Sequence, residues 1–208
     1  AVSRFNQPVR SAMAAMLAAA VLVGCGESEP AGSPSTDQGV PLADAVDTME
    51  PQSVWQNFYD LTQVPRPSHH EEKVTLFVAH FGRGLGLETS VDDVGNVLIR
   101  KPATEAMEKR PVVVLQSHLD MVPQQTEEST TDFETDPIEA FVDEGWVHAD
   151  GTTLGADDGI GVAIIMAILQ ADHISHGPLE ALFTVNEEDG MTGIDALAPD
   201  ALKGRTYI

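Results

Sequence analysis

The sequence is poor in positive charge. Lysine and arginine together number 11, against 33 aspartates and glutamates, and the formal net charge is −22. Nucleic-acid binding depends on clusters of lysine and arginine that contact phosphates, and the sequence has no such cluster. The composition therefore argues against a nucleic-acid partner. Cysteine is also scarce: Cys25 is the only one, so the chain cannot form an intramolecular disulfide.

Long apolar runs are scarce as well, and the clearest one lies near the start of the chain. Residues 11–23 are rich in Ala, Met, Leu and Val; they follow Arg4 and Arg10 and lead into a Leu-Val-Gly-Cys box that ends at Cys25. A run of about 13 residues is too short for a comfortable membrane span. The pattern predicts a bacterial secretory signal over residues 1–25, with lipidation of the cysteine. The alternative is a buried amphipathic helix, which the lack of a polar stripe disfavours.

Residues 26–50 contain almost no large apolar side chain and several prolines, glycines and serines. This composition predicts a flexible tether. Together with the signal segment, it predicts a periplasmic protein or a lipoprotein that contacts the membrane only through a lipid anchor at Cys25. A cytoplasmic location is the alternative. Residues 51–208 remain, and they are about one domain's length of chain.

The densest acidic tract spans residues 127–144 and contains no lysine or arginine. A calcium-binding loop would place its acids at an ordered spacing, which is missing here. We therefore predict that the tract forms a solvated loop and an edge strand that aid solubility.

The rest of the chain alternates between helical and extended patterns, which predicts one α/β domain. Apolar residues recur at helical spacing in two segments, and a third segment is apolar on nearly every face, as in a helix that packs under a sheet. Alternating or continuous apolar runs bounded by turn residues predict strands. The predicted helices cover residues 54–64, 71–85 and 160–169, and the predicted strands cover residues 87–91, 96–100 and 179–185.

A further predicted strand leads into the motif Leu-Gln-Ser-His-Leu-Asp-Met, which ends at Met121. Side chains two residues apart lie on one face of a strand, so His118 and Asp120 can contact each other at its C-terminal end. A metal-bound histidine commonly donates its second ring nitrogen to a carboxylate. His118 is therefore a candidate metal ligand with Asp120 as its partner. Taken alone, the motif also fits a solvated polar strand end.

Two acidic motifs follow. Asp157 and Asp158 lie among glycines at the start of a predicted helix, where a pair of capping residues is the alternative to a metal ligand. Glu187 and Glu188 directly follow a predicted buried strand, where an acidic surface turn is the alternative.

His118, Asp157 and Glu188 thus all stand at the ends or starts of regular elements. The C-terminal ends of parallel strands form one rim of an α/β sheet, where ligands gather. An imidazole combined with carboxylate oxygens suits a divalent ion such as zinc, manganese or cobalt. We therefore predict a metal site at this rim.

From about Pro51 onwards, the chain resembles the N-terminal part of the catalytic domain of the aminoacyl-histidine dipeptidases, also called peptidase D or cytosol non-specific dipeptidases. These are di-zinc metallopeptidases. The resemblance implies an α/β fold with a mixed sheet flanked by helices, incomplete at its C-terminus. The matching motifs are Val-Pro-Arg-Pro-Ser at residues 64–68 with the following His70-Glu71-Glu72, and residues 95–102, 115–124, 151–161 and 176–188.

The resemblance also implies roles for individual residues. His118 would bind one of two divalent ions and Glu188 the other, and Asp157 would bridge them; zinc is expected, with manganese or cobalt as alternatives. Glu187 would be the general base that acts on a metal-activated water, and Asp120 would orient His118. A cis peptide bond would follow Asp157. The substrates would be Xaa-His and other dipeptides, and the full-length protein would be a homodimer.

The sequence departs from the family pattern in two ways. Asp158 stands where the family usually has asparagine, and Asp189 where it has a small residue; each added charge should tighten cation binding and raise the pKa of neighbouring carboxylates. Family members are also more than twice as long, so their remaining metal ligands and lid domain would lie beyond residue 208. We therefore expect the 208-residue chain to bind metal weakly and to be inactive, and a longer parent to be a peptidase.

Two other functions remain open from the sequence. A related metal-dependent aminoacylase or carboxypeptidase would use the same rim, and a non-catalytic, acidic, lipid-anchored binding protein could keep it as a relic. The other histidines lack the acidic neighbours that His118 has at its strand end, and we predict that they are structural or exposed. They are His69, His70, His80, His148, His173 and His176.

Overall fold

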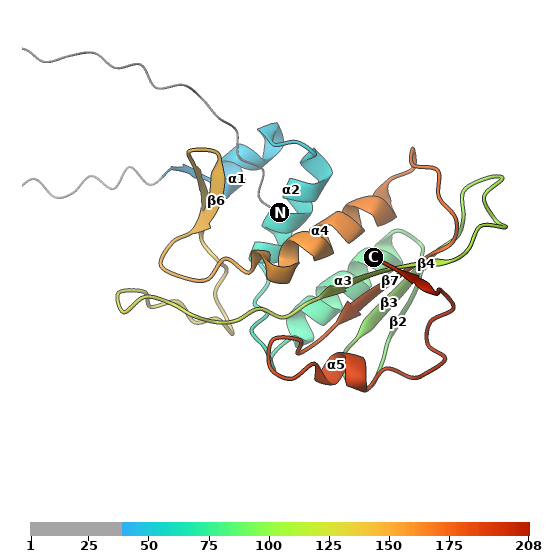
Figure 1. Cartoon of the computed structure of the whole chain (residues 1–208). Helices are drawn as coiled ribbons and strands as arrows, with labels where there is room; N and C mark the ends of the chain where they lie inside the picture. Colours follow the sequence, from blue (N-terminus) through green and yellow to red (C-terminus); the bar gives the residue numbers. More distant parts are fainter. Residues whose placement is uncertain (1–38) are drawn as a thin grey trace, which may run out of the picture. The chain divides into compact units, whose positions relative to one another are not determined.

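The computed structural model describes residues 39–208, and a five-stranded sheet is the largest element of this part of the chain (Figure 1). Three strands pair antiparallel, and the fourth in spatial order runs parallel to both of its neighbours. The predicted α/β fold with a mixed sheet is therefore confirmed. In spatial order the strands are β2 (Glu88–Val91), β3 (Val97–Lys101), β7 (Leu179–Thr184), β4 (Val113–His118) and β8 (Thr206–Tyr207).

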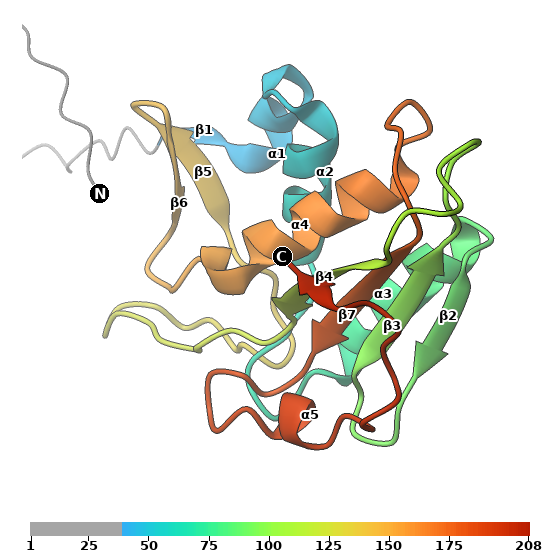
Figure 2. The same ribbon diagram turned by 45° about the vertical axis from the view of Figure 1, so that its right-hand side comes forward.

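Helices α3 (Glu72–Gly84) and α4 (Ala156–Gln170) pack on one face of this sheet, next to the C-terminal turn of α2 (Gln52–Thr62) (Figures 1 and 2). The sequence explains this arrangement. Val74 and Val78 lie one turn apart on α3, and alternate residues of β3, such as Val97 and Ile99, point to the same face. All four are fully buried in the main core.

The opposite face of the sheet carries a smaller core. Along each strand, every second residue faces α3 and α4, and the residues that alternate with these point to the opposite face. The chain between β7 and β8, which includes the short helix α5 (Thr192–Asp195), covers this face (Figure 2). The small core consists of Leu98, Val114 and Leu182, with Leu197 and Leu202 packed against them.

A second sheet of three strands lies against α2, with β5 (Ala140–Asp143) between the other two. Its remaining strands are β1 (Val40–Pro41) and β6 (Trp146–Ala149), and α1 (Leu42–Ala45) and the 3₁₀ helix η1 (Val46–Thr48) follow β1.

This second sheet corrects two expectations. Residues 40–48 were predicted to belong to the tether, yet they form regular elements, because Leu42 is fully buried in a cluster with Phe58 and Val46 is buried one helical turn later. The domain therefore begins before the predicted boundary at residue 51. β5, in the acidic tract, is a central strand and not the predicted edge strand, because β1 pairs with its free side.

The predicted signal segment, residues 1–25, lies outside the described residues, and so does most of the predicted tether. Within residues 39–208, none of the helices combines the length and the apolar character that crossing a membrane requires.

Glu180 is a buried carboxylate near the start of β7, outside the predicted metal site. It accepts hydrogen bonds from the backbone N–H groups of Lys203 and Gly204 at 2.8 and 2.9 Å and from Nε of Arg100 at 3.0 Å. Burial by itself would raise the pKa of Glu180, but these hydrogen bonds outweigh it and lower the pKa below its ordinary value. The carboxylate thus attaches the segment before β8 to the sheet.

We expect Glu180→Gln to lower the free energy of unfolding by about 1.5–3 kcal/mol at neutral pH, the range for hydrogen bonds to a charged group. Because folding lowers the pKa of Glu180, its contribution is complete above the unfolded-state pKa of about 4.3 and is lost as the pH falls through the folded-state pKa. Urea denaturation of both proteins should therefore show a difference at neutral pH that shrinks in acid. Glu88→Gln is the matched control: Glu88 is an exposed partner of Arg100, and its loss should cost less than about 1 kcal/mol.

Candidate metal centre

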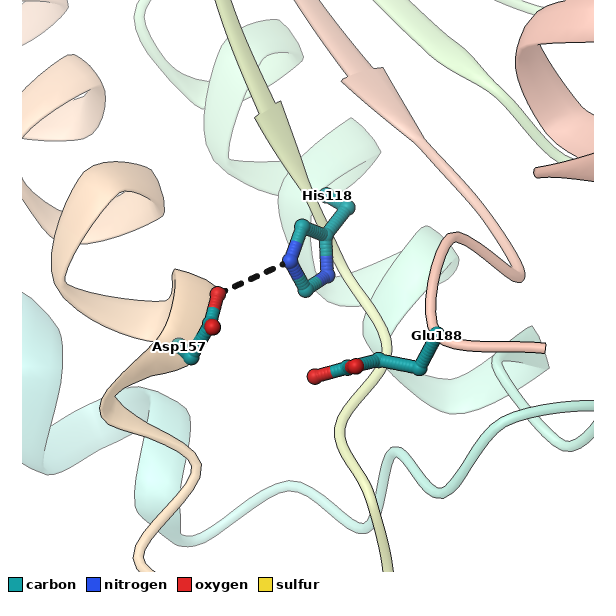
Figure 3. A group of neighbouring side chains, drawn as sticks. All are labelled: His118, Asp157 and Glu188. Atoms are coloured by element: carbon teal, nitrogen blue, oxygen red, sulfur yellow. Dashed lines mark hydrogen bonds and ion pairs between the residues drawn. The ribbon is translucent and has the colours of Figure 1, made fainter. Parts of the chain in front are cut away.

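The C-terminal ends of the parallel strands β4 and β7 lie side by side, with His118 paired in register with Thr184. His118 is the last residue of β4, and Glu187 and Glu188 follow β7 after a short turn. Asp157 lies in the first turn of α4. Figure 3 shows that the side chains of His118, Asp157 and Glu188, from three separate elements, point toward a common space.

These three residues form a group with metal-binding geometry. Nε2 of His118 lies 3.1 Å from Oδ1 of Asp157. One ligand atom of each of His118, Asp157 and Glu188 lies within 4.8 Å of the others. One imidazole nitrogen and two carboxylates are a donor set that suits zinc or a related divalent ion. The residues present therefore fit a metal ion.

The backbone around Asp157 is unusual, and one of its features, a cis peptide bond, was implied by the family resemblance. The Asp157–Asp158 peptide bond is cis. Both residues have non-helical backbone angles inside α4, and Gly155 before them has a left-handed φ of 67°. The N-cap position is occupied by Gly155, and the carboxylates of Asp157 and Asp158 contact the side chains of His118 and Ser117. The side chain of Asp157 is 85% exposed and is free to face the site.

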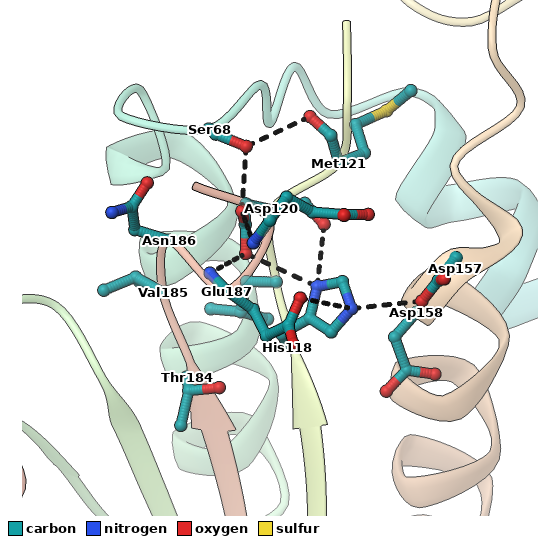
Figure 4. Close-up of polar contacts among 12 residues, drawn as sticks. Ser68, His118, Asp120, Met121, Asp157, Asp158, Thr184, Val185, Asn186 and Glu187 are labelled. Atoms are coloured by element: carbon teal, nitrogen blue, oxygen red, sulfur yellow. Dashed lines mark hydrogen bonds and ion pairs between the residues drawn. The ribbon is translucent and has the colours of Figure 1, made fainter. Parts of the chain in front are cut away.

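Asp120 is fully buried and connects the two strand ends (Figure 4). Nδ1 of His118 lies 3.1 Å from the Asp120 carbonyl oxygen and 3.4 Å from its carboxylate. The same carboxylate accepts hydrogen bonds from the backbone N–H groups of Glu187 and Glu188, at 2.9 and 3.1 Å, and from the Ser68 hydroxyl at 2.8 Å. Asp120 therefore contacts His118, as predicted, and it also fixes the turn that carries both glutamates.

The charges in the site shift the pKa values of its groups. Burial alone would lower the pKa of His118, but hydrogen bonds and charges from Asp120 and Asp157, with the charge of Asp158, raise it to about 9. Burial would raise the pKa of Asp120, but its hydrogen bonds from His118, Glu187, Ser68 and Glu188 lower it to about 2. Asp120 therefore stays ionised at neutral pH.

The pKa of Glu188, in contrast to that of Asp120, is raised. Desolvation raises its pKa, and the negative charges of Asp157, Glu187 and Asp120 add to the rise, against the lowering effect of His118. Carboxylates that repel one another in this way gain from a shared cation, which supplies the largest local charge in such a site. The raised pKa of Glu188 and the type of ligand atoms therefore both fit a bound cation.

The two residues that depart from the family pattern lie at the edge of this group. Asp158 accepts a hydrogen bond from Ser117 at 2.5 Å. Asp189 pairs with the exposed His69, at 2.7 Å between the two side chains. The expected rise in a carboxylate pKa occurs at Glu188, but the charges that cause it are those of Asp157, Glu187 and Asp120.

Sequence reasoning gave no role to the segment between α2 and α3, although this segment contacts every part of the site. Arg66 donates to carbonyl groups next to His118 and Asp157, Ser68 donates to Asp120, and Glu71 accepts the backbone N–H of Asn186 at 2.9 Å. Besides the match of residues 64–68 and 70–72 to the family motifs, the one available signal was an arginine between two prolines in a chain with few basic residues. It indicates a rigid, non-helical segment but not its contacts.

The fold and this group together define an α/β domain with a candidate metal centre at the C-terminal rim of its sheet. Comparison with known proteins makes the assignment more specific. Residues 114–207 match Peptidase family M20/M25/M40. The cytosol non-specific dipeptidase of Escherichia coli (strain K12) is 48% identical over 160 residues, which cover 77% of this chain and 33% of that protein. The chain therefore carries a segment of an M20/M25/M40 peptidase domain, at residues 114–207.

Solved structures agree with this assignment. The aminoacylhistidine dipeptidase from Vibrio alginolyticus matches with a TM-score of 0.76 and 45% identity, over 78% of this chain and 33% of that chain. The aminopeptidase PepT from Bacillus cereus matches with a TM-score of 0.64 and 26% identity, over 75% of this chain and 42% of that chain. The resemblance to aminoacyl-histidine dipeptidases is thus confirmed, and the chain spans about a third of the length of the two dipeptidases.

Proposed function

We propose that the protein is a metal-dependent dipeptidase. The observation that carries this proposal is the convergence of His118, Asp157 and Glu188 at one rim, with ligand atoms within 4.8 Å of one another and Glu187 beside them. The 48% identity to a dipeptidase supports the substrate class, over the third of that relative that the chain spans. Xaa-His and other dipeptides are the proposed substrates, and a homodimer is the proposed assembly.

Two divalent ions, zinc in the first instance and manganese or cobalt as alternatives, would be held by the residues of the candidate centre. His118 would hold one ion and Glu188 the other, with Asp157 between them. Such a pair of ions, when bound, supplies a Lewis acid and lowers the pKa of a bound water to about 7. His118 would ligate through Nε2, because Nδ1 faces the carbonyl and carboxylate of Asp120.

Glu187 is the proposed general base. Its Oε2 lies 3.9 Å from Nε2 of His118, and its side chain is 35% exposed, so it is close to the proposed ligands and open to solvent. A carboxylate in this position can take a proton from the attacking water and deliver it to the departing amine. Asp120 holds the backbone N–H groups of Glu187 and Glu188, and this keeps the base and the proposed ligand in separate directions.

The location of the protein follows from residues 1–25, which predict export and a lipid anchor at Cys25. We propose a periplasmic or membrane-anchored protein on this basis. The Escherichia coli relative is named as a cytosolic enzyme, and a cytoplasmic location is the alternative.

Metal removal tests the proposed activity. We expect the full-length protein to release both amino acids from an Xaa-His dipeptide, to lose this activity after dialysis against a chelator, and to regain it when zinc, manganese or cobalt is added, because the ligands alone cannot activate water. Amino-acid release can be followed by chromatography. Hydrolysis of N-acylated amino acids or of longer peptides in place of dipeptides would favour an aminoacylase or a carboxypeptidase. If the metal-loaded protein hydrolysed none of these substrates, the result would favour the non-catalytic, lipid-anchored binding protein.

A further inference from the structure

Arg66 is a buried cation that lies between the two elements carrying His118 and Asp157. It is 2% exposed. Its Nη1 donates to the carbonyl oxygens of Leu119 at 2.9 Å and Asp120 at 3.3 Å, and its Nη2 donates to the carbonyl oxygen of Gly155. One guanidinium therefore joins the chain just after β4 to the chain just before Asp157.

Two glycines near Asp157 make room for this guanidinium. A Cβ atom on Gly155 would lie 2.5 Å from Nη2 of Arg66, and a Cβ atom on Gly159 would lie 2.6 Å from the same atom. Both distances are too short for any side chain. The start of α4 lies this close to Arg66 because these positions on either side of Asp157 lack a Cβ atom, and a Cβ atom at either position would force Nη2 to shift.

We propose that Arg66 is a positioning residue that sets the location of Asp157 relative to His118 and thereby the affinity for metal. The Asp157 side chain is 85% exposed, and its contact at 3.1 Å is with His118, its partner in the site, so the backbone at the start of α4 decides where its carboxylate lies relative to that ring. Arg66 binds this backbone two residues before Asp157 and the β4 end one and two residues after His118. The inference rests on the proposed metal site.

The geometry requires an arginine. A guanidinium donates from separate nitrogens in fixed, planar directions, and here it reaches carbonyl groups of two elements at once. The ammonium group of a lysine is a single point that could reach one of them. Burial lowers the pKa of Arg66 to about 10, and the nearby carboxylates of Asp120 and Asp158 oppose this shift, so the guanidinium stays charged at neutral pH.

The test is the affinity of the intact, metal-free protein for Zn²⁺ or Co²⁺, measured by calorimetric titration or cobalt absorbance well below the unfolding temperature. We expect Arg66→Lys to weaken metal binding by about 10–100-fold, the range for residues that orient metal ligands. Arg100→Lys is the matched control, because Arg100 also donates to a carbonyl group and to carboxylates, at a distance from the site. It should lower the unfolding temperature and leave the metal dissociation constant unchanged.

A second variant keeps the arginine and disturbs the same contact. Gly159→Ala places a methyl group against Nη2 of Arg66 and should also weaken metal binding. If Arg66→Lys fails to fold, this variant alone tests whether the contact of Arg66 with the start of α4 sets the metal affinity. Should the unmodified protein bind neither ion, the proposed metal site fails and the role of Arg66 fails with it. Tight binding by the unmodified protein, with unchanged dissociation constants in the folded Arg66→Lys or Gly159→Ala protein, would overturn the role of Arg66 alone.

Discussion

Glu187→Gln should lower kcat for dipeptide hydrolysis by about 10²–10⁴-fold, the range that general acid–base catalysis contributes. Glutamine preserves the shape of the side chain but cannot take a proton from water. The backbone N–H of residue 187 still donates to Asp120, so the turn that carries Glu188 should keep its place. Metal affinity should therefore stay within a few-fold of the unmodified protein, and steady-state kinetics with metal titration would separate the two quantities.

Asp189→Asn is the matched control for this experiment. It removes one negative charge from the same turn, but the Asp189 side chain is exposed and pairs with His69. With metal at a saturating concentration, kcat for hydrolysis by this variant should change little, although its metal affinity should fall with the lost charge. If Glu187→Gln retained turnover close to that of the unmodified protein, Glu187 would be excluded as the base, whereas equal losses in both variants would point to a general effect of charge.

Asp120→Asn should produce the second large effect, because it acts on binding and on stability at once. We expect metal affinity to fall by about 10–100-fold, as for other partners of metal ligands. The free energy of unfolding should fall by about 1.5–3 kcal/mol, because a fully buried carboxylate that accepts several hydrogen bonds is replaced by a neutral amide. Metal titration and urea denaturation of the metal-free protein measure the two effects.

Ser68→Ala provides a graded comparison with Asp120→Asn. It removes one hydrogen bond to the Asp120 carboxylate and leaves the charge and the two backbone N–H contacts in place. Its effects should have the same sign and a smaller size, because only one of the hydrogen bonds to the carboxylate is lost. Unchanged metal affinity in Asp120→Asn would show that the contact with His118 does not orient the ring.

Much of the fold is predictable because local periodicity decides it. The helix predicted at residues 54–64 is α2, Gln52–Thr62, and the strands predicted at residues 87–91 and 96–100 are β2 and β3, which pair antiparallel. Each has a strong apolar pattern and clear turn residues, so neighbours in the sequence suffice. The rim location of His118 follows similarly, since the apolar run before it is long enough to form a strand.

The parts that were not predictable depend on contacts between distant segments. The short apolar pattern of residues 40–48 gains its structure only when Leu42 meets Phe58, and β5 becomes a central strand only when β1 pairs with it. The role proposed for Arg66 depends on glycines about 90 residues later in the chain. Composition places residues 26–50 among tethers, because it does not report packing against another element.

The candidate centre depends on the register of β4 and β7, in which His118 pairs with Thr184. A slip of one residue between β4 and β7 would turn every side chain of β4 to the other face and carry the imidazole away from the glutamates. Only the correctly paired chain could then capture metal, so metal would select it by mass action, adding about 2.7 kcal/mol at a concentration one hundred times the dissociation constant. Metal present during folding would thus raise the fraction of chains in which β4 and β7 are paired in the correct register.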